Sequence, residues 1–392
     1  MSKVASEGKQ TTRRFLGEEH QIFRQAFKKF LEKEAVPYID QWEEDRLVPL
    51  TFWKKLGEQG FLCPWADERY GGLNADFGYS VVMTEELVNI GIGQSAAIGL
   101  HNDIIMPYIQ NYGNEEQKSR WIPGAVSGEI MSAVAMTEPG TGSDLAAIKT
   151  TAVRQGDYFV LNGEKTFISN GILANLIIVA VKTDQKAVPG HKGISLIVVE
   201  EGTPGFKRGK KLNKIGMHAQ DTAELIFEDA LVPVENLLGE ENKGFYYLME
   251  KLQQERLMIS ITALNSAKRI LDITLNYVKE RKVFGKPVGS FQNTQFKLAE
   301  LATEIKIGQT FLDDLIVKHI AKENVVTEVS MSKWWITELA KKAANECLQL
   351  HGGYGYMEEY EIARWYRDVA VMSIYAGTNE IMKSIIAGKL GI

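Results

Sequence analysis

The chain has 392 residues, 45% of them hydrophobic and 24% charged, a composition typical of ordinary globular proteins and a length that suits roughly two or three domains. The formal net charge of −5 excludes a global basic field that would attract nucleic acid or an anionic membrane. The two cysteines, Cys63 and Cys347, are too few for a disulfide framework and lack the spacing of a metal site, so no metal is expected.

Nothing in the sequence predicts membrane insertion, because no apolar run is long enough to cross a bilayer. The first fourteen residues, MSKVASEGKQTTRR, lack the apolar segment of a secretory signal. A cytoplasmic protein is therefore expected. One basic run, Lys207–Lys211, is interpreted as a solvated hairpin rim rather than as a nucleic-acid patch.

Residues 1–132 are predicted to form an N-terminal helical domain. The segment EEHQIFRQAFKKFLEKEA carries Phe23, Phe27 and Phe30 at helical spacing, and Pro37 limits this helix. The sequence pattern then changes from helical spacing to short β-prone runs, and residues 133–240 are predicted to form a central antiparallel β-domain. Its clearest signal is FVLNGEKTFIS, which predicts a hairpin with its turn at Asn162-Gly163. Further β-prone runs cover 176–183, 193–200 and 223–229.

Residues 241–392 are predicted to form a C-terminal helical bundle, because two long pieces lack interior Gly and Pro. The first of these pieces raises a question. On a helix, Leu252 and Ile259 lie on one apolar stripe, with Glu255 inside the stripe and Arg256 at its border. A lone buried carboxylate costs several kcal/mol. The residues leave two explanations open, a buried Glu–Arg pair that fixes the bundle register or a functional carboxylate.

The loop AMTEPGTGSD, Ala135–Asp144, is the strongest ligand-binding candidate. Gly140 and Gly142 allow close approach of the backbone, Thr137 and Ser143 offer hydroxyls, and successive N–H groups suit a pyrophosphate. The alternative is a plain turn. The loop is not a dinucleotide fingerprint of the GxGxxG type that follows a strand.

Four weaker motifs follow along the chain. Thr166–Gly171 places a flat ring beside a hydroxyl, which suits the wall of a planar cofactor or simply a core strand. Arg281–Gln295 breaks a long helix with Arg, Phe and Gln. Gln349–Tyr356 is a glycine-dense helix end, where His351 has the alternative of a capping role. Finally, the Ala376-Gly377 turn offers bare N–H groups before a helix capped near Thr378.

Taken in order, AMTEPGTGSD, GEKTFISNG, RKVFGKPVGSFQ, QLHGGYGY and YAGTNEI resemble the acyl-CoA dehydrogenase family over nearly the whole chain. FISNG, GEENKGFYYLME and QQER are most similar to the long-chain branch. The resemblance implies an N-terminal helical domain, a central antiparallel β-domain and a C-terminal four-helix bundle. It also implies FAD, α,β-dehydrogenation of acyl-CoA to trans-2-enoyl-CoA, electron-transfer flavoprotein as acceptor, and a homotetramer built as a dimer of dimers.

The resemblance assigns contacts with the flavin and its pyrophosphate to the loop Val134–Ser143, and contacts with the isoalloxazine ring to Phe167–Ser169. It implies that Arg281, Gln292 and Gln349–Gly353 reach the FAD of a neighbouring subunit. Residues 378–380 would close over that same cofactor. The implied flavin-binding residues are Val134, Met136, Thr137, Gly142, Ser143, Phe167, Ile168, Ser169, Arg281, Phe284, Gln292, Gln349, Leu350, His351, Gly352, Gly353, Thr378, Asn379 and Glu380. The implied substrate-binding residues are Ser143, Tyr246, Gln253, Gln254, Arg256, Tyr375 and Gly377. Phe167 and Ser169 depart from the Trp and Thr of many relatives but keep a ring and a hydroxyl.

The position of the base is the most informative departure. Many family members carry the catalytic glutamate in the turn, where this chain has Ala376; long-chain and isovaleryl-type relatives carry it on the first bundle helix, here at Glu255. The resemblance therefore implies Glu255 as general base and the Ala376 main-chain N–H as a donor to the thioester oxygen.

The resemblance favours medium-to-long straight chains in the first step of β-oxidation, with branched isovaleryl-type or terpenoid acyl groups as the alternative. A flavin oxidase or monooxygenase of the same fold is a further alternative, and the retained Glu255 argues against it. A flavin-binding scaffold without activity, or a nucleic-acid-associated homologue, is disfavoured by the charge of −5.

Overall fold

The computed structural model describes residues 13–392, so the expectation for the first fourteen residues falls almost entirely outside the described range. The N-terminal part is helical, as predicted, and the first helix ends just before Pro37. Its helices are α1 (Glu18–Glu34), α2 (Ile39–Asp45), α3 (Leu50–Glu58), α4 (Phe77–Ile90), α5 (Ile92–Gly99), α6 (Met106–Tyr112) and α7 (Glu115–Ser127). A π-helical segment, Leu100–Ile105, joins α5 to α6.

The middle of the chain forms an eight-stranded sheet in the order β6-β7-β3-β2-β4-β5-β8, with β1 paired to β4. The strands are β1 (Ser132–Ala135), β2 (Thr151–Gln155), β3 (Tyr158–Ser169), β4 (Leu176–Lys182), β5 (Ile194–Glu200), β6 (Phe206–Lys211), β7 (Thr222–Pro233) and β8 (Leu237–Leu238). Most pairs are antiparallel, but β4 pairs in parallel with β1 and β2, so the sheet is mixed. The long connection between β1 and β4 returns the chain to the same end of the sheet, which parallel pairing requires.

The predicted hairpin turn at Asn162-Gly163 is wrong. Both residues lie inside the twelve-residue strand β3, at a register shift against β7. Gly163 has φ 144°, and a Cβ there would lie 2.6 Å from Thr150 Oγ1, so glycine serves a close tertiary contact rather than a turn. The true hairpin connects β2 to β3 at Gly156-Asp157.

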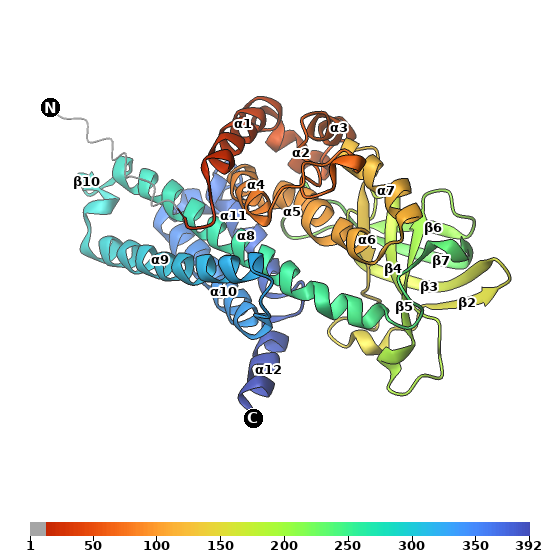
Figure 1. Cartoon of the computed structure of the whole chain (residues 1–392). Helices are drawn as coiled ribbons and strands as arrows, with labels where there is room; N and C mark the ends of the chain where they lie inside the picture. Colours follow the sequence, from red (N-terminus) through yellow and green to blue (C-terminus); the bar gives the residue numbers. More distant parts are fainter. Residues whose placement is uncertain (1–12) are drawn as a thin grey trace.

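Three long helices dominate the C-terminal part, followed by two shorter ones. They are α8 (Gly244–Glu280), α9 (Gln292–Ile320), α10 (Val326–His351), α11 (Glu361–Asp368) and α12 (Asn379–Leu390), with a small ribbon of β9 (Lys282–Val283) and β10 (Lys286–Pro287). α8 begins beside β5, where a Cβ on Gly244 would come within 2.6 Å of the Ser195 carbonyl carbon, and runs across the molecule into the bundle (Figure 1). No helix of the described chain is long and apolar enough to span a membrane.

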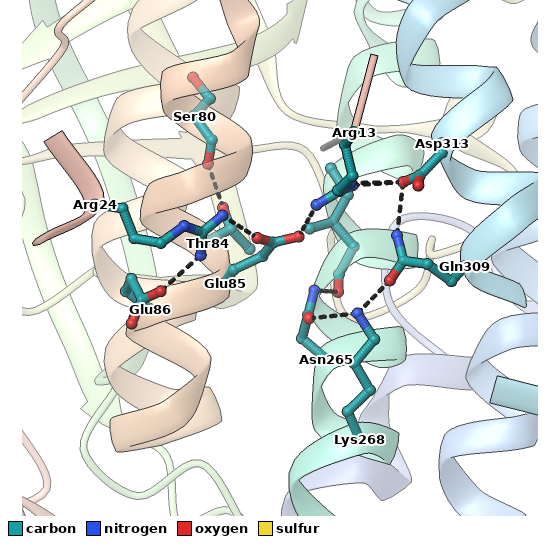
Figure 2. Close-up of polar contacts among 11 residues, drawn as sticks. Arg13, Arg24, Ser80, Thr84, Glu85, Glu86, Asn265, Lys268, Gln309 and Asp313 are labelled. Atoms are coloured by element: carbon teal, nitrogen blue, oxygen red, sulfur yellow. Dashed lines mark hydrogen bonds and ion pairs between the residues drawn. The ribbon is translucent and has the colours of Figure 1, made fainter. Parts of the chain in front are cut away.

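A partly buried network of charges joins the N-terminal helices to the bundle (Figure 2). Glu85 on α4 accepts hydrogen bonds from Arg13 and from Arg24, the latter at 2.6 Å. Arg13 Nε also donates to Asp313 of α9 at 2.9 Å, and the network continues through Gln309 to Lys268 of α8. Burial opposes ionisation of Glu85, but the two arginines outweigh it, so the pKa of this carboxyl lies below its ordinary value.

Replacing Glu85 with glutamine is expected to lower the free energy of unfolding by about 3 kcal/mol, because two partly buried guanidinium groups lose the counter-charge that they share. Since the folded pKa of Glu85 is depressed, its stabilising effect is present at neutral pH and is lost as the pH falls through that pKa. Urea unfolding at neutral and acidic pH measures both effects. The control is Glu32→Gln, an exposed glutamate on α1; equal losses in the two variants would contradict the prediction.

Candidate active site

Glu255 lies on the buried face of α8 and is only 3% exposed. Its Oε1 accepts a hydrogen bond of 2.8 Å from the hydroxyl of Tyr108, which α6 contributes. Burial raises the pKa of Glu255 to about 7, while the Tyr108 hydrogen bond and the positive charges of Arg256 and Lys251 act in the opposite direction. A carboxyl whose pKa lies near neutrality suits proton transfer at physiological pH.

Arg256 does not form the buried ion pair that would make Glu255 a structural residue: no ion pair within 4 Å joins the two side chains in the described chain. Arg256 is 5% exposed, and its guanidinium lies beside the turn that precedes α12, since a Cβ on Gly377 would sit 3.7 Å from Nη2. Arg256, the residue that follows Glu255 on α8, therefore contacts the C-terminal turn.

That turn has an unusual backbone. Ala376 and Gly377 are both left-handed, with φ of 49° and 85°, and Thr378 caps α12 by accepting a hydrogen bond from the Ile381 N–H. A fully buried lysine of α10, Lys333, donates to the Gly377 carbonyl at 2.8 Å. In the described chain no hydrogen bond uses the Ala376 N–H, which leaves this donor available to a ligand.

The loop after β1 and the end of β3 lie together in the structure. The Thr166 N–H donates to the Thr137 carbonyl at 3.0 Å. Beneath them the ammonium of Lys165, which is fully buried, donates to Glu138 Oε1 at 2.9 Å. Burial lowers the pKa of Lys165 to about 8, and Glu138 opposes that shift. The Phe167 ring is 68% exposed, with φ 58°.

A second candidate region lies at the other end of α8. A cavity of about 500 Å³ is lined by Tyr277, Arg281, Val283, Val288, Gln349, Leu350, His351, Gly352, Gly353, Tyr354 and Met357. His351 is a satisfied histidine there, with Nδ1 donating to the Cys347 carbonyl at 2.9 Å and its ring stacked on Tyr277 at 4.2 Å. Phe284 is 96% exposed. Tyr277 follows Glu255 by 22 residues of helix, roughly 33 Å at 1.5 Å per residue, so one chain does not bring the two regions together.

The two glutamines expected to contact substrate are engaged within the chain. Gln253 accepts from the Val325 N–H at 3.0 Å and donates to the Glu323 carbonyl at 3.2 Å. Gln254 donates to the Asp103 carbonyl at 2.6 Å. Tyr246, at the start of α8, is 45% exposed.

Family models match this architecture along almost the whole chain. The acyl-CoA dehydrogenase N-terminal domain matches residues 17–129, the middle domain 133–230 and the C-terminal domain 242–391. The chain belongs to the acyl-CoA dehydrogenase family. It is thus an oxidoreductase that acts on the CH–CH group of acyl-CoA.

Individual relatives agree with this assignment. This acyl-CoA dehydrogenase is 47% identical to the long-chain specific acyl-CoA dehydrogenase of Rattus norvegicus mitochondria, over 96% of this chain and 88% of the relative. It is similar to the crystal structure of an acyl-CoA dehydrogenase from Geobacillus kaustophilus, with 63% identity, a TM-score of 0.96, and 97% and 100% of the two chains covered. A Bacillus anthracis acyl-CoA dehydrogenase solved with FAD is 32% identical, with a TM-score of 0.89 and 97% and 68% covered.

FAD is the cofactor of acyl-CoA dehydrogenases, and the residues of this chain fit it. An aromatic ring 68% exposed, as Phe167 is, leaves a flat apolar surface that suits the face of an isoalloxazine. In the adjoining loop, a Cβ on Gly140 or Gly142 would meet nothing within 4 Å, so the backbone there is open to a phosphate group. The cavity around Gly352 and Gly353 adds a second open glycine backbone.

Three residues that bond to the candidate site residues of this acyl-CoA dehydrogenase were not predicted from the sequence. Tyr108 donates to Glu255, Lys333 donates to the Gly377 carbonyl, and Lys165 of β3 donates to Glu138 in the loop after β1. A lysine on the apolar face of a predicted helix or strand was the available signal for the last two. Tyr108 carried no such signal, because a buried tyrosine is ordinary in a helix.

Proposed function

We propose that this acyl-CoA dehydrogenase oxidises medium-to-long straight-chain acyl-CoA to trans-2-enoyl-CoA, the first step of β-oxidation, with Glu255 as the general base. The observation that carries the proposal is a buried carboxyl with a pKa of about 7 on α8, next in sequence to Arg256, whose guanidinium lies beside the turn that holds Ala376 and Gly377. The preference for long chains is supported by the 47% identity to a long-chain specific relative.

Two groups of this chain act on the thioester in the proposed reaction. Glu255 accepts the proton from the α-carbon of the thioester, and the Ala376 N–H donates a hydrogen bond to the thioester oxygen, where negative charge accumulates. Lys333 holds this left-handed turn through the Gly377 carbonyl, and the Ala376 N–H has no hydrogen-bond partner in the described chain. The hydride that leaves the β-carbon would pass to the flavin, which is the chemistry that bound FAD would supply. Water is kept from Glu255 by the packing that leaves it 3% exposed.

Two sets of residues are proposed to hold FAD. Thr137 to Ser143 and Phe167 to Ser169 hold it from one subunit, while Arg281, Gln292 and Gln349 to Gly353 reach it from a neighbour. The cavity beside Tyr277 lies roughly 33 Å along α8 from Glu255, which supports the contribution of this region to the cofactor of a neighbouring subunit. A homotetramer and transfer of electrons to electron-transfer flavoprotein complete the proposal.

Anaerobic mixing of the FAD-containing enzyme with a series of acyl-CoA substrates tests the proposal. Medium-to-long straight chains are expected to bleach the visible flavin band faster than butyryl-CoA or isovaleryl-CoA. Fastest bleaching by isovaleryl-CoA would assign branched chains instead. Absence of bleaching by every acyl-CoA, with FAD retained, would overturn the proposed reaction. In the same reaction repeated with oxygen present, oxygen consumption at a rate equal to flavin reduction would indicate an oxidase.

A further inference from the structure

The π-helical segment Leu100–Ile105 lies directly before the helix that supplies Tyr108. Its defining hydrogen bond runs from the Met106 N–H to the His101 carbonyl, five residues back. A π turn places an extra residue in the helix and rotates everything that follows relative to a regular α-helix, and such turns occur frequently at functional sites. The direction in which α6 presents Tyr108 therefore depends on this segment.

Two consecutive side chains hold the segment in place. Asn102 donates to the Phe61 carbonyl at 3.1 Å and accepts from the Cys63 N–H at 2.9 Å. Asp103 accepts from the Ser80 hydroxyl at 2.6 Å. Because both side chains are almost fully buried, these contacts fix the π turn against the N-terminal helices.

The segment is also bonded to α8 immediately beside Glu255. Gln254 donates to the Asp103 carbonyl at 2.6 Å, and one residue further along α8 Glu255 accepts from Tyr108 at 2.8 Å. Tyr108 is fully buried, so its hydroxyl exchanges no hydrogen bond with bulk water. Glu255 Oε2 has no hydrogen-bond partner among residues 13–392, which leaves that oxygen for proton transfer.

We propose that Tyr108 is a positioning residue for the general base: its hydroxyl holds Oε1 of Glu255, and the π turn before α6 aims it there. The inference rests on the proposed function of Glu255. Tyr108 is 147 positions from Glu255 in the sequence and belongs to the N-terminal helical part of the fold, whereas Glu255 belongs to α8.

The charges around Glu255 give the hydrogen bond a measurable consequence. The groups that face the carboxyl are Tyr108 from α6 and Lys251 and Arg256 from α8 itself. Burial raises the pKa of Glu255, and of the three opposing influences the Tyr108 hydrogen bond is the largest. Burial and the Glu255 charge hold the pKa of Tyr108 well above its ordinary value, so Tyr108 stays a donor across neutral pH. Loss of the hydroxyl therefore raises the pKa of the base.

The test is the pH dependence of flavin reduction by a saturating acyl-CoA, measured on the FAD-containing Tyr108→Phe enzyme. The rising limb of the profile is expected to move to higher pH by about one unit, and the rate on the high-pH plateau to fall about tenfold because Oε1 is no longer held. Tyr112→Phe is the matched control. It removes a hydroxyl from the same helix whose ring stacks on Tyr247 and does not bond to Glu255, so its limb should coincide with that of wild type.

A change that strengthens the hydrogen-bond donor at position 108, rather than removing it, distinguishes an effect on the Glu255 pKa from a purely structural effect. Site-specific 3-fluorotyrosine at position 108 keeps the shape and strengthens the donor, so the limb should move to lower pH. A lower plateau with an unmoved limb in Tyr108→Phe, or no response to the fluorinated residue, would overturn the inference. Glu255→Gln separates the two hypotheses: if it reduces flavin normally, the proposed base fails; if it is impaired while Tyr108→Phe matches wild type, only the role of Tyr108 fails.

Discussion

Glu255→Gln is expected to slow flavin reduction by acyl-CoA about 10²- to 10⁴-fold, the usual contribution of a positioned general base. Glutamine keeps the shape of the side chain and can still accept from Tyr108, but it cannot take up the α-proton. The substitution removes no flavin contact proposed here, so FAD content should match wild type. Anaerobic stopped-flow measurement of the visible flavin band reports the rate directly.

The wild-type enzyme supplies a second signature of the same group. Since only the ionised carboxylate accepts a proton, the rate should rise with pH around the Glu255 pKa of about 7, and this limb should be absent in the glutamine variant. Glu250→Gln is the matched control, because Glu250 is an exposed glutamate on the same helix. Equal rates for the two variants would show that another group is the base.

Lys165→Met is expected to lower the free energy of unfolding by about 3 to 5 kcal/mol and to weaken FAD binding strongly. Methionine fills a similar volume but leaves the Glu138 carboxylate, which is 6% exposed, without its counter-charge. Glu138 also accepts from the main-chain N–H groups of Lys149 and Thr150, at 2.6 and 2.9 Å. Loss of the ammonium therefore disturbs the base of the loop that carries the proposed flavin contacts.

Urea unfolding and titration of the apoenzyme with FAD measure the two effects of Lys165→Met. Lys149→Met is the control: it makes the same substitution at an exposed side chain on the same loop and leaves the main-chain hydrogen bond to Glu138 intact. The stability of this control should stay within about 0.5 kcal/mol of wild type, as for ordinary surface changes. A Lys165→Met enzyme that binds FAD like wild type would show that the ion pair does not support the loop.

Short sequence patterns correctly predicted features that neighbouring residues in the sequence determine, such as helix ends and the buried face of a helix. The apolar stripe on α8 placed Glu255 in the core, and the structure buries it there. The Thr378 cap and the helix end before Gly352 were likewise predicted from short motifs and are present. The resemblance to the family then supplied the fold, because five motifs in the correct order specify more than any one pattern does.

Features that depend on distant contacts were missed or misread. Asn162-Gly163 has the strongest local hairpin signal in the β-domain, yet the space beside Thr150 decides what Gly163 does. The parallel pairing of β1 with β4 depends on the path of a long connection. Whether burial or Arg256 would dominate the pKa of Glu255 required the packing around the carboxyl, which is known only once the fold is formed.

The left-handed turn at Ala376 has a consequence for mutational tolerance. A donor that belongs to the main chain survives every substitution except proline, so the side chain at 376 is free to vary among residues that accept φ of 49°. The function proposed for Glu255 belongs to one side chain and has no such freedom. Saturation libraries at the two positions should therefore differ, with position 376 accepting residues that tolerate a left-handed backbone and position 255 nearly invariant. Substitution at position 376 therefore leaves the proposed donor to the thioester oxygen in place.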